Sequence, residues 1–249
     1  MSTRFTCAWV AAALCVGALC TSCVSSISGT AKPAEHHRIP GIEQILPTLE
    51  ETNADVGSQL EPNGPPSVGG SDKLAADLKD NADIAPIECL GPVQPRERVV
   101  YQQAPVKAVA IQEYWNHQRA PGGVLVVRAA AIELASEPAA RKFFETSVQQ
   151  WKQCDGRTAV ITKEDRIHVM WNVKVGDVAV SGPLLTATNR WWDEPPKPAF
   201  PDGRALGIAA NVIVDVDVTM DPDYGTPAPV GDRATKVANE MLRKVTTTY

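Results

Sequence analysis

The amino-acid sequence predicts an α+β domain in which a twisted antiparallel β-sheet carries two main amphipathic helices on one face. Three observations lead to this fold class. Several apolar runs are rich in β-branched residues or alternate between apolar and polar side chains, as strands do. The links between some of these runs have the length of hairpin turns, which favours antiparallel pairing. Two further segments repeat their apolar residues at helical spacing, and such helices can cover a sheet face.

The composition is that of an ordinary globular protein and argues against nucleic-acid binding. The chain has 249 residues, of which 44% are hydrophobic, with 24 Lys+Arg, 29 Asp+Glu and a formal net charge of −5. A nucleic-acid surface needs clustered Lys and Arg to displace counterions, and no basic run of five or more occurs. We therefore expect no nucleic-acid partner.

The first 22 residues have the pattern of an export signal. Arg4 precedes the apolar run Cys7–Cys20, which is about 14 residues long and too short for a membrane-spanning helix. The run leads into Cys20-Thr21-Ser22-Cys23, which resembles a bacterial lipoprotein cleavage site, although Cys20 stands where an aliphatic residue is usual. The resemblance implies that residues 1–22 are removed and that Cys23 receives a diacylglyceryl group, with acyl chains such as palmitate. A secreted soluble product and an uncleaved anchor are the alternatives.

This assignment leaves two cysteines in the mature chain. Three cysteines leave with the signal peptide and Cys23 is lipidated, so Cys89 and Cys154 remain. Two thiols in an oxidising compartment form one disulfide bond with one possible connectivity. Two buried free cysteines are the alternative.

Residues 23–70 are rich in Pro, Ser and Gly and show no sustained apolar period, so we expect a tether. Apolar residues between Ile42 and Leu49 could form a short helix, but Pro47 interrupts their spacing and no cap is evident. The pair His36-His37 lacks further metal ligands and is typical of a solvated linker. The folded domain is expected over residues 71–249.

From Ser71 onward the signals of strands and helices become regular. Ser71 can cap a short helix, Ser136 can cap a longer helix that ends at Cys154, and Asp232 can open a last helix. Strands are expected at Val106–Trp115, Val124–Leu134, Arg166–Val173, Val178–Thr188 and Ala205–Thr219, with a turn at Gly176-Asp177 and with Trp191-Trp192 in a Pro-rich loop.

Two of these strands have one apolar face each. In Arg166–Val173 the odd-numbered residues are apolar, and in Ala205–Thr219 the valines at the even numbers from 212 to 218 share a face. We expect the two helices to bury both faces, so the opposite faces meet solvent, a loop or a ligand. The candidate ligand-binding residues combine those opposite faces with the tryptophan loop: His168, Met170, Asn172, Asp215, Asp217, Trp191 and Trp192.

Several segments resemble a known family. They are Asp83-Ile84-Ala85-Pro86-Ile87-Glu88-Cys89, Val99-Val100-Tyr101, Trp151-Lys152-Gln153-Cys154, the valine-rich strand and the final helix. Together they are similar to the PknH-like extracellular sensor domains, which also occur in mycobacterial lipoproteins. The resemblance covers about residues 71–249, and Ser28-Gly29-Thr30-Ala31 is similar to the tethers of those lipoproteins.

The resemblance implies an antiparallel sheet with flanking helices around a cleft, and a role in binding or sensing outside the cytoplasm. Cys89 and Cys154 match one disulfide of the family. The second disulfide has no counterpart, because Trp191-Trp192 and Met220 lie near the positions where its cysteines are expected.

Motifs of the common catalytic sites are missing from the sequence. It has no G-x-S-x-G nucleophile elbow, no Walker motif, no G-x-G-x-x-G loop and no kinase segment. The aspartates between Asp215 and Asp223 depart from the EF-hand pattern and are typical of a solvated strand edge and turn. We expect neither a metal nor another cofactor, and no enzymatic activity.

The sequence therefore predicts a non-catalytic, ligand-binding or sensing lipoprotein on the extracytoplasmic side of the mycobacterial cell membrane. Its expected partners are the membrane, through the lipid anchor, and a small molecule, a lipid, a glycan or an envelope protein. The alternative is an envelope carrier or hydrolase acting on a lipid or a glycan. A deep, closed apolar pocket would favour the carrier, and convergent His, Ser and Asp side chains would favour the hydrolase.

Overall fold

A computed structural model describes residues 41–119, 123–162, 170–193, 199–221 and 229–248. The proposed signal peptide, Cys23 and His168 lie outside these residues. Among the helices in the described ranges, none combines the length and the apolar character that crossing a membrane would need.

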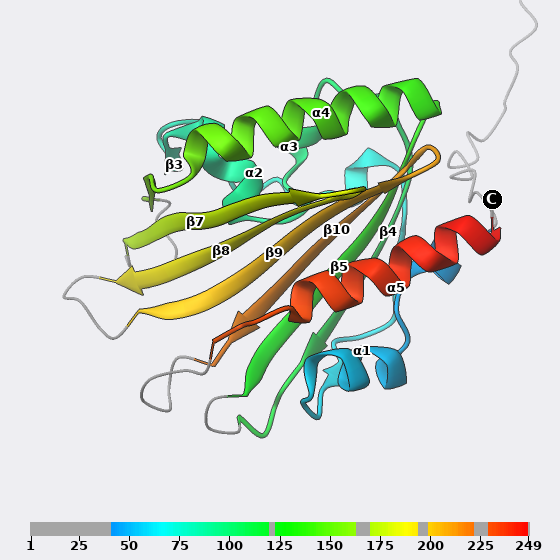
Figure 1. Ribbon diagram of the computed structural model, residues 1–249, viewed down its shortest axis with the longest axis horizontal. Coiled ribbons are helices and arrows are strands. Elements are labelled where there is room, and N and C mark those ends of the chain that lie inside the picture. Colours follow the sequence, from blue (N-terminus) through cyan, green and yellow to red (C-terminus); the bar gives the residue numbers. More distant parts are fainter. Residues whose placement is uncertain (1–40, 120–122, 163–169, 194–198, 222–228, 249) are drawn as a thin grey trace, which may run out of the picture. The chain divides into compact units, whose positions relative to one another are not determined.

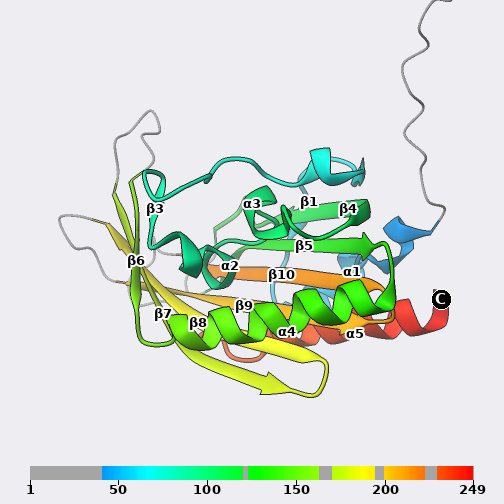
Figure 2. The same ribbon diagram turned by 90° about the horizontal axis from the view of Figure 1, so that it is seen from above.

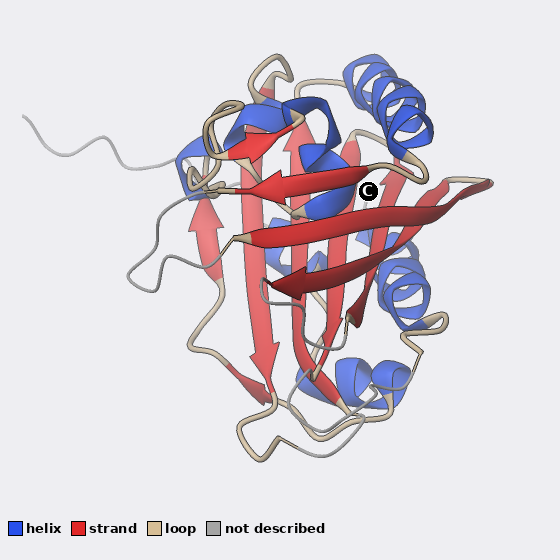
Figure 3. Ribbon diagram, turned by 90° about the vertical axis from the view of Figure 1, so that its left-hand side faces the viewer, coloured by secondary structure: helices blue, strands red, loops and turns tan. Residues whose placement is uncertain are grey.

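The described strands form one antiparallel sheet, with the order β1-β4-β5-β10-β9-β8-β7-β6-β3, and β2 also pairs with β4 (Figure 1). Strands at one side of the sheet run almost across those at the other side, as Figure 3 shows, because each strand is twisted relative to its neighbour. The strands are β1 Glu61–Pro62, β2 Ser67–Gly69, β3 Ile84–Ala85, β4 Val106–Trp115, β5 Val124–Leu134, β6 Thr158–Ile161, β7 Trp171–Ser181, β8 Leu184–Asp193, β9 Phe200–Ala209 and β10 Val212–Met220.

Two long helices and several short ones accompany the sheet. The α-helices are α1 Leu49–Val56, α2 Leu90–Val93, α3 Arg98–Tyr101, α4 Glu137–Cys154 and α5 Arg233–Thr248, and the 3-10 helices are η1 Ile42–Ile45, η2 Ser71–Lys73 and η3 Ile87–Cys89. The α+β class, the bounds of β4, β5 and α4, and the start of α5 agree with the sequence prediction. The Ser136 hydroxyl accepts a hydrogen bond from the Ala139 N–H at 3.3 Å, which is the cap expected for α4.

The two long helices lie on opposite faces of the sheet, and the prediction that both cover one face is wrong (Figures 1 and 2). In β10, Val214 and the other even-numbered valines pack in the core with α5, while Ile213 packs in the core with α4. Ala129, Ala130 and Ala131 of β5 are all fully buried. The central strands are therefore apolar on both faces, so each face needs its own helix.

Residues 41–60 are folded, which corrects the predicted tether over this part. The Thr48 hydroxyl accepts from the Glu51 N–H at 3.2 Å, and the Glu51 carboxylate accepts from the Thr48 N–H at 2.7 Å. This capping box starts α1 directly after Pro47, so the proline separates η1 from α1 rather than breaking a helix. Buried side chains of this segment join the core under α5: Ile42, Ile45, Leu46, Val56 and Leu60.

Other element boundaries differ from the prediction because some turns lack an obvious signal. Gly176-Asp177 lies inside β7, where the register with β8 shifts. The run Ala205–Thr219 is divided into β9 and β10 by a turn at Ala210, whose φ is 49°. Trp191 and Trp192 lie on β8 rather than in a loop, and the helix expected after Ser71 is only the short η2.

Helix α5 packs closely on β9 because small residues lie beneath it. A Cβ on Gly207 would stand 2.8 Å from Val214 Cγ2 and 2.9 Å from Leu242 Cδ1. A Cβ on Gly203 would stand 2.8 Å from Val230 Cγ2. The absence of a side chain at Gly207 lets α5 approach the sheet, and its absence at Gly203 leaves space for Val230, which precedes the helix.

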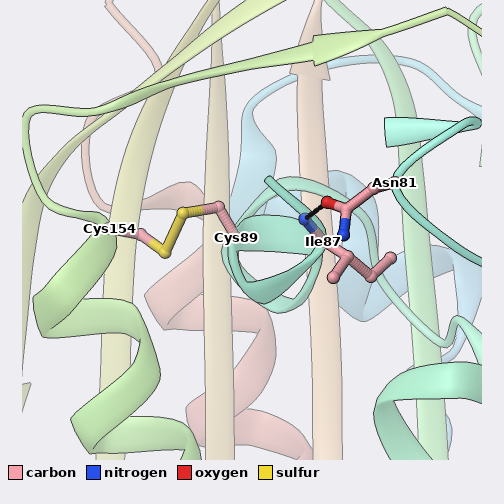
Figure 4. The surroundings of a disulfide bond; sticks show 4 residues. All are labelled: Asn81, Ile87, Cys89 and Cys154. Carbon is pink, nitrogen blue, oxygen red and sulfur yellow. Dashed lines mark hydrogen bonds between the residues drawn. A yellow bond between two sulfur atoms is a disulfide. The ribbon is translucent and has the colours of Figure 1, made fainter. Parts of the chain in front are cut away.

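The predicted disulfide joins Cys89 to Cys154, with a Cα–Cα distance of 5.6 Å (Figure 4). It connects the end of η3 to the last residue of α4. Close to it, the Ile87 N–H donates to Asn81 Oδ1 at 2.8 Å. The bond therefore ties the segment of η3, α2 and α3 to the α4 side of the sheet.

Candidate functional site

Four charged residues cross the α4 face of the sheet at directly paired positions. Glu113 of β4 is opposite Arg128 of β5, Arg128 is opposite Asp217 of β10, and Asp217 is opposite Arg204 of β9. Arg128 Nη1 donates to Asp217 Oδ2 at 2.7 Å. We call these four residues the charged ladder. Alternating charges on neighbouring strands attract one another, so the ladder stabilises this register.

Arg204 is the most deeply buried member of the ladder, with 1% of its surface exposed. Its Nη2 donates to Asp215 Oδ1 at 2.7 Å and its Nη1 donates to the Val216 carbonyl at 2.6 Å. The guanidinium carbon lies 5.5 Å from the centroid of the Trp151 ring of α4. The buried cation thus has a carboxylate, a carbonyl and an aromatic face around it.

Asp215 ties the segment of α2 and α3 to the sheet. Its Oδ2 accepts from the Tyr101 hydroxyl and from the Arg96 backbone N–H, both at 2.8 Å. Burial, followed by the neighbouring Asp215 charge, raises the pKa of Tyr101 well above its ordinary value, so this hydroxyl remains a donor. Asp215 is therefore surrounded by donors from the protein itself.

Asp202 and Asp217 form a buried pair of carboxyl groups whose pKa values are shifted in opposite directions. Burial and the adjacent Asp217 raise the pKa of Asp202 well above its ordinary value. Burial alone would raise the pKa of Asp217, but hydrogen bonding with Asp202 and the charges of Arg128 and Arg204 lower it. Asn189 Nδ2 donates to Asp202 Oδ2 at 3.1 Å. The two carboxyl groups are therefore shifted in opposite directions, Asp202 toward its protonated form and Asp217 toward its charged form.

A cleft of about 350 Å³ opens beside the charged ladder. Trp171 and Trp191 form one part of its lining, and Arg96 and Arg128 form another. Trp191 Nε1 donates to Asp202 Oδ2 at 3.4 Å, and its ring stacks on Phe200 with centroids 6.3 Å apart. We call this the indole cleft, and its walls are connected to the ladder through Arg128 and Trp191.

A second cleft of about 430 Å³ lies between α4 and the α2–α3 segment. Its lining combines apolar side chains such as Val99 and Phe143 with amides such as Gln103 and Gln150. The Phe143 ring stacks on Tyr101 with centroids 4.6 Å apart. The sequence analysis does not predict this cleft, because no sequence signal indicates that α2 and α3 stand opposite α4.

The structure divides the predicted ligand-binding residues between the two faces of the sheet. Trp191, Asp215 and Asp217 are on the α4 face, and of these three Trp191 lines one of the two clefts described above. Asn172 and Trp192 are paired on β7 and β8, and their side chains point to the opposite face. Met170, just before β7, is 45% exposed, and His168 lies outside the described residues. The prediction assumed one shared face because it placed both tryptophans in a loop.

Comparisons with known proteins agree on one family. The model of the PknH-like extracellular domain matches residues 40–244. Serine/threonine-protein kinase PknH of Mycobacterium tuberculosis (strain ATCC 25618 / H37Rv) is 24% identical over 204 residues, which cover 82% of this chain and 30% of the kinase. PknH of Mycobacterium bovis is also 24% identical over 204 residues, covering 31% of its length. The matched segment thus spans less than a third of these relatives.

The fold agrees with that of a solved structure. The crystal structure of the extracellular domain of PknH from Mycobacterium tuberculosis superposes with a TM-score of 0.66 at 23% sequence identity, and the match covers 85% of this chain and 99% of that chain. The matched segment includes residues 41–60, which fold onto α5 in this protein. Since the family model spans most of the chain and the fold is shared, this protein belongs to the PknH-like extracellular domain family.

Proposed function

We propose that this protein is a non-catalytic, lipid-anchored sensor of the cell envelope that holds its ligand in the indole cleft. The observation that supports this proposal is the lining of the cleft, in which two tryptophans and two arginines lie beside the acidic residues Asp77 and Glu97. Indole faces bind sugar rings and apolar rings, and guanidinium groups donate several hydrogen bonds in one plane. The ligand therefore combines a ring with hydrogen-bond acceptors.

Arg128 belongs both to the lining of the indole cleft and to the charged ladder, so a ligand in the cleft can change interactions within the sheet. A ligand that accepts from Arg128 competes with Asp217, and one that turns Trp191 disturbs its hydrogen bond to Asp202. Both carboxyl groups belong to the buried pair whose pKa values depend on each other and on Arg128 and Arg204. Occupancy of the cleft would thus alter the ion pairs that connect β5, β10 and β9, and this supports a sensing role.

Native mass spectrometry of the full chain purified from a mycobacterial host tests the proposal. We expect a small molecule to copurify with the wild-type protein and to be lost in Trp191→Ala. Trp192→Ala is the matched control, because it removes the same side chain from the opposite face and should retain the molecule. Trp191→Phe keeps an aromatic ring next to Phe200 and is the second variant if Trp191→Ala unfolds. Equal retention in the Trp191 and Trp192 variants, or no bound molecule in the wild type, would contradict the proposal.

The lipid anchor has a separate test. Two or more acyl chains hold a protein on a membrane, whereas one chain binds only marginally. Cys23→Ala should therefore release the chain from the membrane fraction or leave an uncleaved precursor. Metabolic labelling with a radioactive fatty acid followed by gel electrophoresis measures the lipid directly. Unchanged lipid labelling in Cys23→Ala would disprove the assignment.

A further inference from the structure

The face of β7 and β8 opposite to α4 carries a group of polar and aromatic side chains that none of the described helices buries. Asn172 is paired with Trp192 and Lys174 with Arg190, and residues paired across two strands share a face. Helix α5 packs on the same side of the sheet over β9 and β10. Lys174 and Arg190 are exposed, and Trp192 is half-buried. We call these four residues the open patch.

The two cations of the open patch stand directly opposite each other. Like charges at paired positions destabilise a sheet. Neither the Lys174 ammonium nor the Arg190 guanidinium makes an ion pair or a hydrogen bond with any described residue. The chain as a whole has a net charge of −5, so this pair is a local positive site on an acidic protein. No carboxylate in the described part of the chain pairs with either cation to offset the repulsion.

A third donor lies next to the cations. The Nδ2 atom of Asn172 is buried and has no hydrogen-bond partner, and only 9% of the Asn172 surface is exposed. A buried donor without a partner is costly, and native proteins rarely keep one without a reason. The ammonium of Lys174, the guanidinium of Arg190 and the amide of Asn172 thus lie on one face, and no described residue accepts a hydrogen bond from any of them. This chemistry fits an anion such as a phosphate group.

The position of the patch outside both clefts points to contact with a surface rather than with an enclosed small molecule. Neither of the two clefts described above includes a residue of the patch, whereas small ligands are usually held in concave sites. A half-buried indole beside two cations is typical of proteins that touch membranes, because indoles favour the headgroup level and Lys and Arg favour anionic lipids. We propose that the open patch docks on the phosphate headgroups of an anionic phospholipid membrane.

Chemical labelling of lysines in the presence of vesicles tests this docking. The full chain is mixed with vesicles of phosphatidylcholine alone or of phosphatidylcholine and phosphatidylglycerol, and an amine-reactive reagent is added. Mass spectrometry then gives the labelling rate of Lys174, with Lys79 and Lys152, which are also exposed, as internal references. We expect phosphatidylglycerol vesicles to slow the labelling of Lys174 severalfold and to leave both references unchanged.

A variant tests whether the protection of Lys174 depends on the positive charge of the open patch or only on contact with the vesicle. Arg190→Gln should weaken the protection of Lys174 about fivefold, since one cation near an anionic surface contributes about that factor. Lys79→Gln is the matched control and should leave the protection unchanged. Equal labelling of Lys174 on both kinds of vesicle would overturn the proposal. Equal protection by soluble glycerol phosphate would also overturn it, because the site would then bind a free anion.

This inference rests on the proposed lipid anchor only because the anchor would bring the open patch near a membrane. Flotation of the chain with vesicles of phosphatidylcholine alone reports the anchor, whereas protection of Lys174 by phosphatidylglycerol reports the patch. A chain that floats without protection therefore disproves the patch and leaves the anchor intact. A chain that is protected but does not float on phosphatidylcholine supports the patch and contradicts the anchor.

Discussion

Arg204 illustrates how single residues on the α4 face hold the sheet together. Its guanidinium lies between Asp215 and the Trp151 ring, and Asp217 is its direct neighbour on β10. Sequence reasoning treated Asp215 and Asp217 as ligand-binding candidates because alternate polar residues on a strand commonly face solvent. In the structure the two aspartates are 2% exposed each and are paired with arginines. Their partners come from other strands, and a strand's own pattern cannot reveal such partners.

Replacing Arg204 with Met should destabilise the protein strongly. Without the cation, Asp215 loses its buried partner, and breaking a buried ion pair from one side costs about 3–5 kcal/mol. Arg141→Met is the matched control, because the Arg141 ion pair with Glu137 on α4 is exposed and contributes little. Urea unfolding at pH 7 measures both free energies of unfolding. The interpretation fails if the two variants unfold at the same urea concentration.

At the scale of elements, the fit of α5 on β9 depends on the space that Gly207 leaves. Gly207 has φ outside the left-handed region, so its role is to leave space rather than to allow an unusual backbone. A side chain there would collide with Val214 and Leu242. Overpacked cores strain both elements and lose stability.

Gly207→Val should therefore lower the free energy of unfolding by about 1–3 kcal/mol, or by more if α5 is displaced. Gly176→Ala on β7 is the control, because its new Cβ would meet only the Thr188 carbonyl oxygen at 3.5 Å, an ordinary contact. Thermal melting followed by circular dichroism compares the two variants. A Gly207→Val protein that melts with the wild type would show that α5 does not pack as described.

The elements that sequence reasoning located correctly are those whose signals are local. Helix α4 has its own cap at Ser136, and β4 and β5 are long apolar runs with a Pro-Gly-Gly segment between them. The turn at Ala210 lacks glycine and proline, so the sequence pattern predicts a single strand where the structure has β9 and β10. The face that each helix covers depends on pairing between distant strands. Local periodicity cannot decide it when β5 is apolar on both faces.

At the scale of the whole molecule, the first described residues and the last helix form one unit. Lys244 Nζ donates to the Leu46 carbonyl at 2.9 Å and pairs with the Glu51 carboxylate at 2.5 Å. Arg233 Nε donates to the Val56 carbonyl at 2.8 Å. Burial raises the pKa of Glu51, but hydrogen bonds from Lys244 and Thr48 outweigh this effect and lower it to about 2.

Two truncations test whether residues 41–60 belong to the domain. A chain that starts at Gly41 keeps η1 and α1 and should melt like the full chain. A chain that starts at Glu61 exposes the apolar side chains of α5 that these residues cover, so it should melt at a lower temperature and bind a hydrophobic dye. Scanning fluorimetry measures both properties. Equal melting of the two truncated chains would mean that the segment is a tether after all.

The contact between Lys244 and Leu46 joins residues that are 198 positions apart in the chain. A ribosome or an export channel releases the N-terminal side of the chain first. The core that α1 shares with α5 can therefore form only after α5 has been released. Contacts between such distant residues form slowly, and exposed apolar strands are prone to aggregate during the delay. The core shared by α1 and α5 is therefore one of the last parts of the domain to form, because it needs both ends of the described chain.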